Sequence, residues 1–207
     1  MAKIVSINPD NPQPRLIEQA ADLLRAGGVI CYPTDTMYGL GCDIFNQKAV
    51  KRIYQIKRRA KDKPFSFMCD SLADISHYGH VGNMAYRLMR KCLPGPYTFV
   101  LPGAKIVPKI MLTRQKTVGI RVPDNAICLA LIAALGNPLL NTSAHAEGES
   151  ASEGAARDAQ DVEELFGKQV DLIIDGGEIE PAPSSVVSLV ADAPEILREG
   201  KGDCGWF

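Results

Sequence analysis

The sequence Val29-Ile30-Cys31-Tyr32-Pro33-Thr34-Asp35-Thr36-Met37-Tyr38-Gly39-Leu40-Gly41 decides how the rest of the chain is interpreted. It begins with a short apolar run that directly follows two glycines, a pattern typical of a buried strand. Pro33 cannot donate a backbone hydrogen bond, and the next three residues favour bonds to their own backbone, so the chain should leave the sheet and turn here. Ligands bind at the carboxyl ends of strands in open α/β sheets, so residues 34–36 form either an ordinary polar turn or a binding loop.

Composition and charge indicate an ordinary soluble protein with one sizeable core. Of the 207 residues, 46% are hydrophobic and 23% are charged, as in a typical globular domain. The formal net charge of -1 gives no overall attraction to nucleic acid or to a membrane, so any binding of anions must come from a local cluster. Since we find no internal repeat and no linker, residues 1–207 are predicted to form a single domain.

The six cysteines predict neither a metal site nor a disulfide framework. They lie far apart, and no two are spaced as Cys-x-x-Cys. Zinc sites need closely spaced ligand pairs, and disulfide frameworks occur mostly in short secreted chains, so buried reduced thiols are expected. We find no signal peptide and no apolar run long enough to span a bilayer, which predicts a cytoplasmic protein without a membrane partner.

Apolar patterns with the periods of strands and of helices alternate along the chain. Strands are predicted at residues 3–7, 29–32, 65–69, 97–101, 117–122, 139–142, 170–174, 185–190 and 195–198. Helices are predicted at residues 16–24, 46–59, 72–78, 83–93, 126–135 and 162–166. This alternation predicts an α/β fold, with a twisted, open, mainly parallel or mixed sheet and helices on its faces. Residues 144–159 lack apolar periodicity and are expected to form a mobile, lid-like loop.

A cluster of cations overlaps the second predicted helix and the residues after it. It comprises Lys51, Arg52, Lys57, Arg58, Arg59, Lys61 and Lys63. Cations near the C-terminus of a helix are each worth about 0.3–1 kcal/mol, but this effect explains only two or three of them. The excess suggests a polyanionic ligand, such as a triphosphate or an RNA backbone. Side chains would have to hold it, because the glycines of a phosphate loop are missing.

Further polar residues stand at the ends of other predicted strands, namely Arg121, Thr142 with Ser143, and Arg198. If the sheet is parallel there, these residues converge on one rim and form a binding site. His145 is of interest only because it follows Ser143 closely. We find no nucleophile with its base, no carboxylate pair and no metal triad, so chemistry here would depend on positioning and charge stabilisation.

Six motifs in this order resemble the YrdC/YciO family. They are Pro-Thr-Asp-Thr-Met-Tyr-Gly-Leu (33–40), Lys-Arg-Arg (57–59) with Lys-Pro (63–64), Pro-Gly-Pro-Tyr-Thr (94–98), Gly-Ile-Arg-Val-Pro (119–123), Thr-Ser-Ala-His (142–145), and Ser-Ser-Val-Val (184–187) with Leu-Arg (197–198). The resemblance covers residues from about 14 to 200. The Ile-x-Pro-Asp-Asn-Pro pattern near the start resembles the YciO branch more than the YrdC branch.

The resemblance implies a YrdC-like fold and a reaction. The fold is a twisted α/β sheet with a deep, basic concave surface that binds ligands. Family members of established activity are threonylcarbamoyl-AMP synthases, which combine L-threonine, bicarbonate and ATP and release pyrophosphate, for the threonylcarbamoyladenosine modification of tRNA. Two alternatives stay open. The chain either binds tRNA or double-stranded RNA in the same cleft without making the adenylate, or it binds a small anion without turnover.

The resemblance also implies roles for individual residues. The catalytic residues, which hold phosphates and the carbamate, are Lys57 and Arg59. The residues expected to bind L-threonine are Thr36, Ser143, Ser184 and Arg121, which pairs with its carboxylate. The residues expected at the nucleotide are Lys57, Arg59, Lys63, Thr117, His145 and Arg198. Mg²⁺ would arrive with ATP, without a dedicated protein site.

The chain departs from the family pattern at several positions, among them Glu147-Gly148 in place of the familiar Ser-Gly after His145. Ala60 stands where proline is usual, Met68 where active relatives can have histidine, and His145 where the Ser-x-Asn motif has asparagine. An asparagine amide donates and accepts at one end of the side chain, whereas neutral histidine does so only through opposite edges of its ring. Nucleotide contacts at His145 are therefore expected to differ from those of the synthases.

Overall fold

The computed structural model describes residues 1–60, 63–145, 154–205 and 207. Its strands are β1 (Lys3–Ser6), β2 (Ile30–Tyr32), β3 (Gly39–Gly41), β4 (Ser66–Met68), β5 (Tyr97–Pro102), β6 (Thr117–Arg121), β7 (Leu139–Ser143), β8 (Leu172–Asp175), β9 (Ser185–Ser188) and β10 (Glu195–Arg198). Its helices are α1 (Pro14–Arg25), α2 (Gln47–Ile56), α3 (Leu72–Tyr78), α4 (Asn83–Cys92), the 3-10 helix η1 (Lys109–Met111), α5 (Ala126–Leu135) and α6 (Ala159–Phe166). The predicted α/β fold is confirmed.

One mixed sheet joins the strands of the described residues, in the order β1-β8-β2-β3-β7-β4-β6-β5-β9-β10. Neighbouring strands are parallel at β1/β8, β8/β2, β4/β6 and β5/β9. They are antiparallel at β2/β3, β3/β7, β7/β4, β6/β5 and β9/β10. Of the two predicted arrangements, the sheet is therefore mixed rather than mainly parallel.

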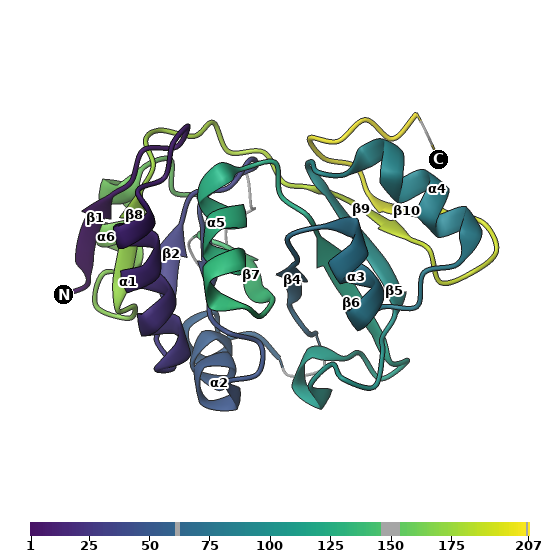
Figure 1. The fold of residues 1–207 in the computed structure, drawn as a ribbon, viewed down its shortest axis with the longest axis horizontal. Coiled ribbons are helices and arrows are strands. Elements are labelled where there is room, and N and C mark those ends of the chain that lie inside the picture. The colour runs from purple at the N-terminus through teal and green to yellow at the C-terminus, as the bar shows by residue number, and fades with distance from the viewer. Residues whose placement is uncertain (61–62, 146–153, 206) are drawn as a thin grey trace.

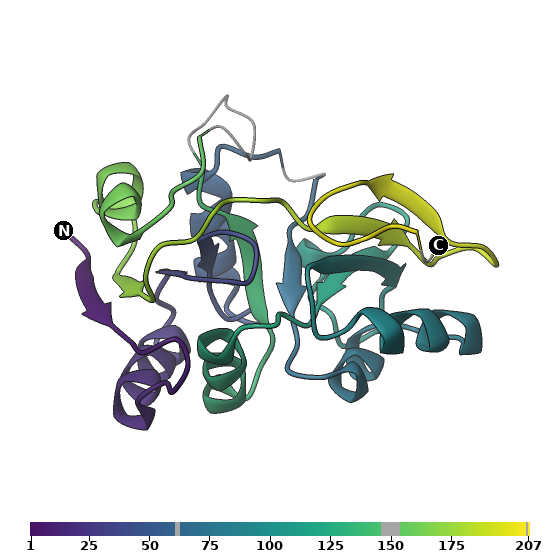
Figure 2. The same cartoon turned by 90° about the horizontal axis from the view of Figure 1, so that it is seen from above.

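Helices cover the two halves of the sheet differently (Figures 1 and 2). Around β2, helices α1 and α5 pack on one face, while α2 and α6 pack on the other. Strand β2 is therefore buried on both faces, which explains its continuous apolar sequence. Helices α3 and α4 lie on one side of β5 and β6 (Figure 2), and the opposite face of these strands lines a cavity.

Capping side chains fix where α2 and α5 begin. The side chain of Asn46 accepts a hydrogen bond from the backbone N–H of Ala49, and Asn125 accepts one from Cys128. Each bond satisfies an N–H group that the first turn of a helix otherwise leaves without a partner. Helix α5 ends at Gly136, whose φ of 74° lies in the left-handed region that favours glycine.

Strand β3 is the main element that the sequence pattern fails to predict. It lies between β2 and β7 and is antiparallel to both, so residues 33–38 form the loop of a hairpin. Its glycines let the neighbouring strands approach closely: a Cβ atom at Gly41 would lie 2.5 Å from the carbonyl oxygen of Leu140 and 2.7 Å from the ring of Tyr32. Because two of its three residues have no side chain, the strand shows no apolar alternation.

Replacing Gly41 with alanine should lower the free energy of unfolding by about 1–3 kcal/mol, because the added methyl group overlaps a backbone carbonyl in a buried strand. The control is Gly205→Ala, whose Cβ would meet only the carboxylate of the exposed Asp203, at 3.2 Å. This exposed substitution should change the free energy by less than about 0.5 kcal/mol. Urea unfolding followed by circular dichroism measures both variants, and equal stabilities would contradict the close packing of β3.

Candidate functional site

A cavity of about 420 Å³ opens on the face of β5 and β6 that α3 and α4 do not cover. Most of its polar lining consists of the hydroxyl residues Thr34, Thr36, Ser66, Thr98, Thr113, Thr117, Thr142, Ser143 and Ser184. The cations that line it are Arg59, Lys63, Arg121 and Arg198. Within the described residues, no aspartate or glutamate lines the cavity, so its charge and its many donors suit an anionic ligand.

Alternation along the strands brings these side chains together. On β6, residues Thr117, Gly119 and Arg121 line the cavity, whereas Ile120 belongs to the core on the opposite face. Strands β5 and β9 follow the same pattern, because successive side chains of a strand point to opposite faces. The site is therefore built from one face of the sheet.

Convergence of these polar residues on one rim was predicted for a parallel sheet, and that condition is not met at β7. Strand β7 is antiparallel to β4, which is parallel to β6. Met68 of β4 pairs with both Arg121 and Leu139, so Arg121 is level with the first residue of β7, whereas Ser143 is its last. The backbones of Arg121 and Ser143 therefore lie at opposite ends of these paired strands, although both residues line the same cavity.

The loop between β2 and β3 contributes Thr34 and Thr36 to the cavity. Thr34 Oγ1 accepts hydrogen bonds from the backbone N–H groups of Thr36 and Met37, at 3.0 and 3.1 Å. The same oxygen donates to the carbonyl of Met37 at 2.7 Å. This local network holds the hairpin loop in one conformation and positions the hydroxyl of Thr36. The binding-loop interpretation of residues 34–36 therefore fits the geometry better than an ordinary surface turn.

Arg121 is only 2% exposed and forms an ion pair with Asp35, whose side chain is 10% exposed. Its Nη2 donates to Asp35 Oδ1 at 2.5 Å, and its Nη1 donates to Thr36 Oγ1 at 2.9 Å. In the described part of the chain, Asp35 Oδ2 and Arg121 Nε are buried without a hydrogen-bond partner. An unpaired buried polar atom costs about 1–3 kcal/mol.

Asp35 was predicted only as part of the turn or binding loop at residues 34–36, without a partner of its own. Its position directly after a strand, between two threonines, is the signal that could have identified it. Arg121 was predicted to bind the carboxylate of L-threonine, and that role stays a prediction.

Arg59 reaches the cavity because α2 ends sharply. Arg58 has a φ of 42°, an uncommon left-handed conformation for a side chain of this size, and directs the chain away from the helix. The guanidinium of Arg59 then lies 4.8 Å from the ring centroid of Phe65, and its Nε donates to the carbonyl of Lys63 at 2.7 Å. Burial lowers the pKa of Arg59, although the group remains a cation.

Lys57 is not among the residues that line the cavity. Its ammonium group donates to the backbone carbonyls of Ser143 and His145, at 3.2 and 3.0 Å. It also lies 5.8 Å from the ring centroid of Phe166. Lys57 thus holds the end of β7, next to a residue of the cavity wall, and its predicted catalytic role stays a prediction.

Ser143 lines the cavity, and its Oγ lies 2.7 Å from Nδ1 of His145. Burial, and then the charges of Lys57 and Arg59, lower the pKa of His145. The imidazole is therefore neutral at pH 7 and protonates only in more acidic solution than a free histidine does. His145 is not a lining residue of the described cavity, but it contacts Ser143, which is one.

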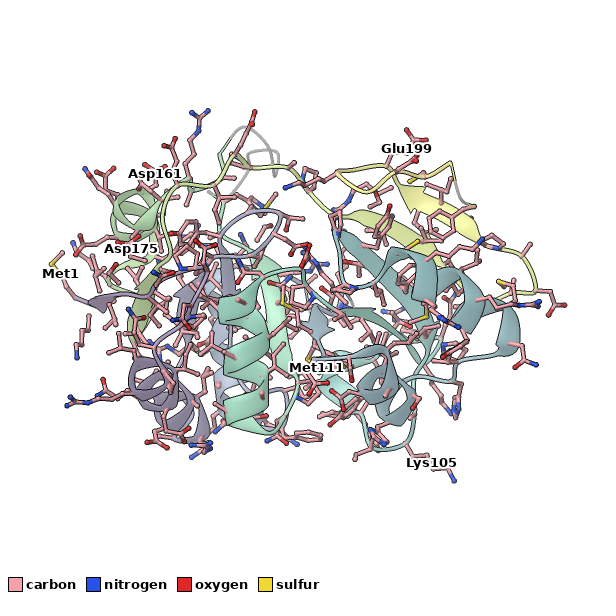
Figure 3. The ribbon with its side chains drawn as sticks, turned by 45° about the horizontal axis from the view of Figure 1, so that its top comes forward. Met1, Lys105, Met111, Asp161, Asp175 and Glu199 are labelled. Carbon is pink, nitrogen blue, oxygen red and sulfur yellow. The ribbon has the colours of Figure 1, made fainter. Side chains whose placement is uncertain are left out.

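Arg198 lies at the end of an exposed strand but turns back towards the cavity. Its guanidinium donates two hydrogen bonds to the carbonyl of Ser184, at 3.0 and 2.7 Å. The next residue, Glu199, points away from the molecule (Figure 3). The hydroxyl of Ser184 lies 3.0 Å from that of Thr98. Burial, and then the charge of Arg121, lower the pKa of Arg198. Two arginines thus repel each other across the site, an arrangement that an anion between them would stabilise.

Thr117 contributes a hydroxyl at the other end of β6. Its Oγ1 lies 2.7 Å from that of Thr113, and both residues line the cavity. Thr117 was predicted to lie at the site, whereas Thr98 and Thr113 were given no role there. Thr98 belongs to the motif at residues 94–98, but Thr113 belongs to a segment whose short polar side chains carry no distinctive pattern.

The cationic cluster of residues 51–63 does not act as one unit. Arg52 pairs with Asp171 at 2.5 Å and donates to the carbonyl of Gln169, so it ties α2 to the segment before β8. Only Arg59 and Lys63 of the cluster line the cavity, and Lys61 lies outside the described residues. Half of the predicted loop at residues 144–159 also falls outside them, because residues 146–153 are not described.

The described residues contain no group of three or more His, Cys, Asp or Glu residues placed to hold a metal ion. None of their helices has the length and the apolar content that crossing a membrane requires. The six cysteines are free thiols in the structure, as predicted, and five of them are buried.

Comparison with known proteins identifies relatives along the whole chain. The chain is 46% identical to "Uncharacterized protein YciO" of Escherichia coli strain K12 over 204 residues, which cover 98% of both chains. It is 34% identical to a threonylcarbamoyl-AMP synthase of Pyrococcus abyssi, over 89% of this chain and 54% of that protein.

Solved structures agree with these relatives. The crystal structure of E. coli YciO matches with a TM-score of 0.94 at 45% identity, over 100% of each chain. The crystal structure of P. abyssi Sua5 complexed with L-threonine matches with a TM-score of 0.87 at 31% identity, over 95% of this chain and 57% of that one. A family model for Sua5, YciO and YrdC, described as "Telomere recombination", matches residues 22–200. This chain therefore belongs to the Sua5/YciO/YrdC family.

Proposed function

We propose that this chain condenses L-threonine, bicarbonate and ATP to threonylcarbamoyl-AMP and pyrophosphate, with lower activity than the synthases. The observation that carries this proposal is that one cavity is lined by Arg59, Lys63, Arg121, Ser143, Ser184 and Arg198. The family relationship adds support, because a relative that is 34% identical is named threonylcarbamoyl-AMP synthase and the matched structure of P. abyssi Sua5 contains L-threonine.

In the proposed reaction the amine of L-threonine and bicarbonate form a carbamate, with loss of water and a proton. A carbamate oxygen then attacks the α-phosphorus of ATP, the bond from that phosphorus to the bridging oxygen breaks, and pyrophosphate leaves. All reactants carry negative charge, so cations must bring them together and stabilise the charge that develops on the phosphoryl oxygens.

The described geometry suggests how the cavity is divided. Arg59 and Lys63 come from the same segment and would hold the phosphates, whereas Arg121 and Thr36 would hold the amino acid at the other end. The remaining proposed contacts are those of Ser143 and Ser184 with L-threonine, of Thr117, His145 and Arg198 with the nucleotide, and of Lys57 with phosphate. Mg²⁺ would enter with the triphosphate, and cytoplasmic tRNA would be the eventual acceptor of the product.

Pyrophosphate release tests this proposal directly. With ATP and Mg²⁺ present, release should require both L-threonine and bicarbonate, because the attacking oxygen belongs to the carbamate that they form. A coupled colorimetric assay at high protein concentration measures the rate with each component left out in turn. Release that is absent from the complete mixture would contradict the proposal. If duplex RNA or tRNA then bound with strong salt dependence, the RNA-binding alternative would be favoured.

Arg59→Ala and Lys57→Ala should both abolish the stabilisation that ATP gives to the folded protein. ATP at a hundred times its Kd should raise the stability of the wild type by about 2.7 kcal/mol, seen as a rise in Tm. Arg25→Ala is the control, because Arg25 pairs with Glu18 and Asp22 on the surface of α1. If ATP stabilised all three variants equally poorly, the stabilisation would depend only on the total charge of the protein. An unchanged response in Lys57→Ala alone would remove Lys57 from the nucleotide site.

His145→Asn should raise the rate of pyrophosphate release about two- to tenfold at pH 7.5, because one added hydrogen bond is worth about 0.5–1.5 kcal/mol. The dependence of the rate on pH separates the effect of the added hydrogen bond from the effect of a charge on the imidazole. Since the pKa of His145 is lowered, the wild type and the variant should have parallel profiles above pH 7, and only the wild type should change in acidic solution as the imidazole protonates. If the variant released pyrophosphate more slowly than the wild type, the expectation that asparagine makes better nucleotide contacts than His145 would be wrong.

A further inference from the structure

A second pocket, of about 100 Å³, lies between α3 and α5. Both helices cover the same side of the sheet (Figures 1 and 2), whereas the cavity of the candidate site opens on the other side. The polar residues that line this second pocket are Asp70, Asp74, Tyr78 and Asn137, and its apolar wall includes Ile132 and Pro138. Within the described residues, no lysine, arginine or histidine lines it. The second pocket is therefore separate from the candidate site and opposite to it in charge.

Tyr78 brings an unused hydroxyl to the second pocket. The residue is only 8% exposed, and the centroid of its ring lies 5.8 Å from that of Phe67 and 6.4 Å from that of Phe45. Its hydroxyl has no hydrogen-bond partner in the part of the chain that the structure describes. Burial, and then the charge of Asp74, raise the pKa of Tyr78 to about 12, so the hydroxyl stays protonated. Buried polar groups rarely lack partners in folded proteins, so this hydroxyl indicates a bound molecule.

Asn137 presents an acceptor to a ligand rather than a donor. Its Nδ2 donates to Asp43 Oδ2 at 2.9 Å. Because an ionised carboxylate only accepts hydrogen bonds, this contact fixes the orientation of the amide and leaves Oδ1 as the remaining acceptor. The residue follows Gly136, which caps the C-terminus of α5, so it lies at the negative end of the helix dipole. Arg25 of α1 donates to the carbonyl of Ala134 in the same turn but is not a lining residue of the pocket.

The two aspartates have a simpler explanation, which accounts for only part of the pocket. They flank Ser71, the N-cap of α3, and carboxylates there offset the positive end of a helix dipole. Asp74 Oδ1 also lies 3.4 Å from Nδ1 of His77, a longer distance than in an ordinary hydrogen bond, and the side chain of His77 is 72% exposed. Capping explains neither the buried hydroxyl of Tyr78 nor the amide oxygen beside it. Together these groups form a set of acceptors that suits a cation.

The lining favours an organic ammonium ion over a metal ion. The described residues contain no group of three or more carboxylate, thiol or imidazole side chains placed for a metal. Apolar residues share the wall with the carboxylates, which suits methylene groups beside a charge. A cavity of about 150 Å³ can hold benzene, so this pocket can hold an ammonium group with a few methylenes. The carboxylates also differ in depth, because the side chain of Asp74 is 24% exposed whereas Asp70 is fully classed as exposed.

We propose that the second pocket binds an aliphatic diamine. One ammonium group donates to Asp74, to Oδ1 of Asn137 and to the hydroxyl of Tyr78, while the methylenes lie against the apolar wall. The other ammonium group pairs with Asp70 at the rim. This inference concerns the opposite side of the sheet from the proposed reaction and does not depend on it.

Isothermal titration calorimetry with 1,4-diaminobutane, n-butylamine and 1,4-butanediol tests the inference. The wild type should bind the diamine about two- to fivefold more tightly than butylamine, since an exposed ion pair contributes little, and should not bind the uncharged diol. Asp74→Asn should weaken diamine binding about ten- to hundredfold, and Tyr78→Phe about two- to tenfold. Asp70→Asn should remove the preference for the diamine over butylamine.

Two controls separate binding from folding and from total charge. Asp192→Asn makes the same change of charge at an exposed position that lines neither pocket, so its affinity for the diamine should equal that of the wild type. Tyr78→Phe keeps the ring and removes a hydroxyl that has no partner among the described residues, so the Tm of the protein without ligand should not fall.

Three results would overturn the inference. One is that the wild type binds no diamine. Another is that Asp74→Asn, Tyr78→Phe and Asp192→Asn all bind it as the wild type does, which would show nonspecific attraction to an acidic surface. The third is that Mg²⁺ displaces the diamine at equal concentration and depends on the same side chains, which would make the pocket a metal site. Pyrophosphate release by the wild type bears on the proposed function alone, so the two proposals stand or fall separately.

Discussion

The ion pair between Asp35 and Arg121 joins the loop after β2 to the end of β6, although β3, β7 and β4 lie between these strands in the sheet. Both side chains are almost completely buried. Removing either partner would leave an uncompensated buried charge, which is strongly destabilising, so the two segments must keep their relative position. Since Thr36 and Arg121 both line the cavity, its shape depends on this pair.

Local charge, rather than the net charge of the chain, decides what the cavity can bind. The chain has a net charge of -1, yet the described lining holds four cations and no carboxylate. Burial lowers the pKa of two of these cations, Arg59 and Arg198, which means that the fold keeps positive charge where water solvates it poorly. An anionic ligand would lower the free-energy cost of holding these poorly solvated charges. Other cations of the same sequence cluster serve the fold, as Arg52 does in binding Asp171.

Most of the elements follow from the sequence because apolar periodicity, capping residues and glycine stops act locally. Helix α5, for example, begins after Asn125 and ends before Gly136, as its pattern predicts. The exception is β3, whose glycines are selected by close contact with Tyr32 and Leu140 on neighbouring strands. Such a contact leaves no periodic signal in the sequence, because it depends on which strands become neighbours.

The sequence by itself determined the residue types of the site and the α/β class, since motifs such as residues 33–40 and 119–123 and the strand-helix alternation are local features of the chain. Only the tertiary structure decided how those residues meet. The antiparallel course of β7 puts the backbones of Ser143 and Arg121 at opposite ends of the strands that line one cavity, and the hairpin of β2 and β3 gives Arg121 its partner Asp35. The physical reason is that strand order and direction come from packing all the strands and helices around a common core, which no single segment specifies.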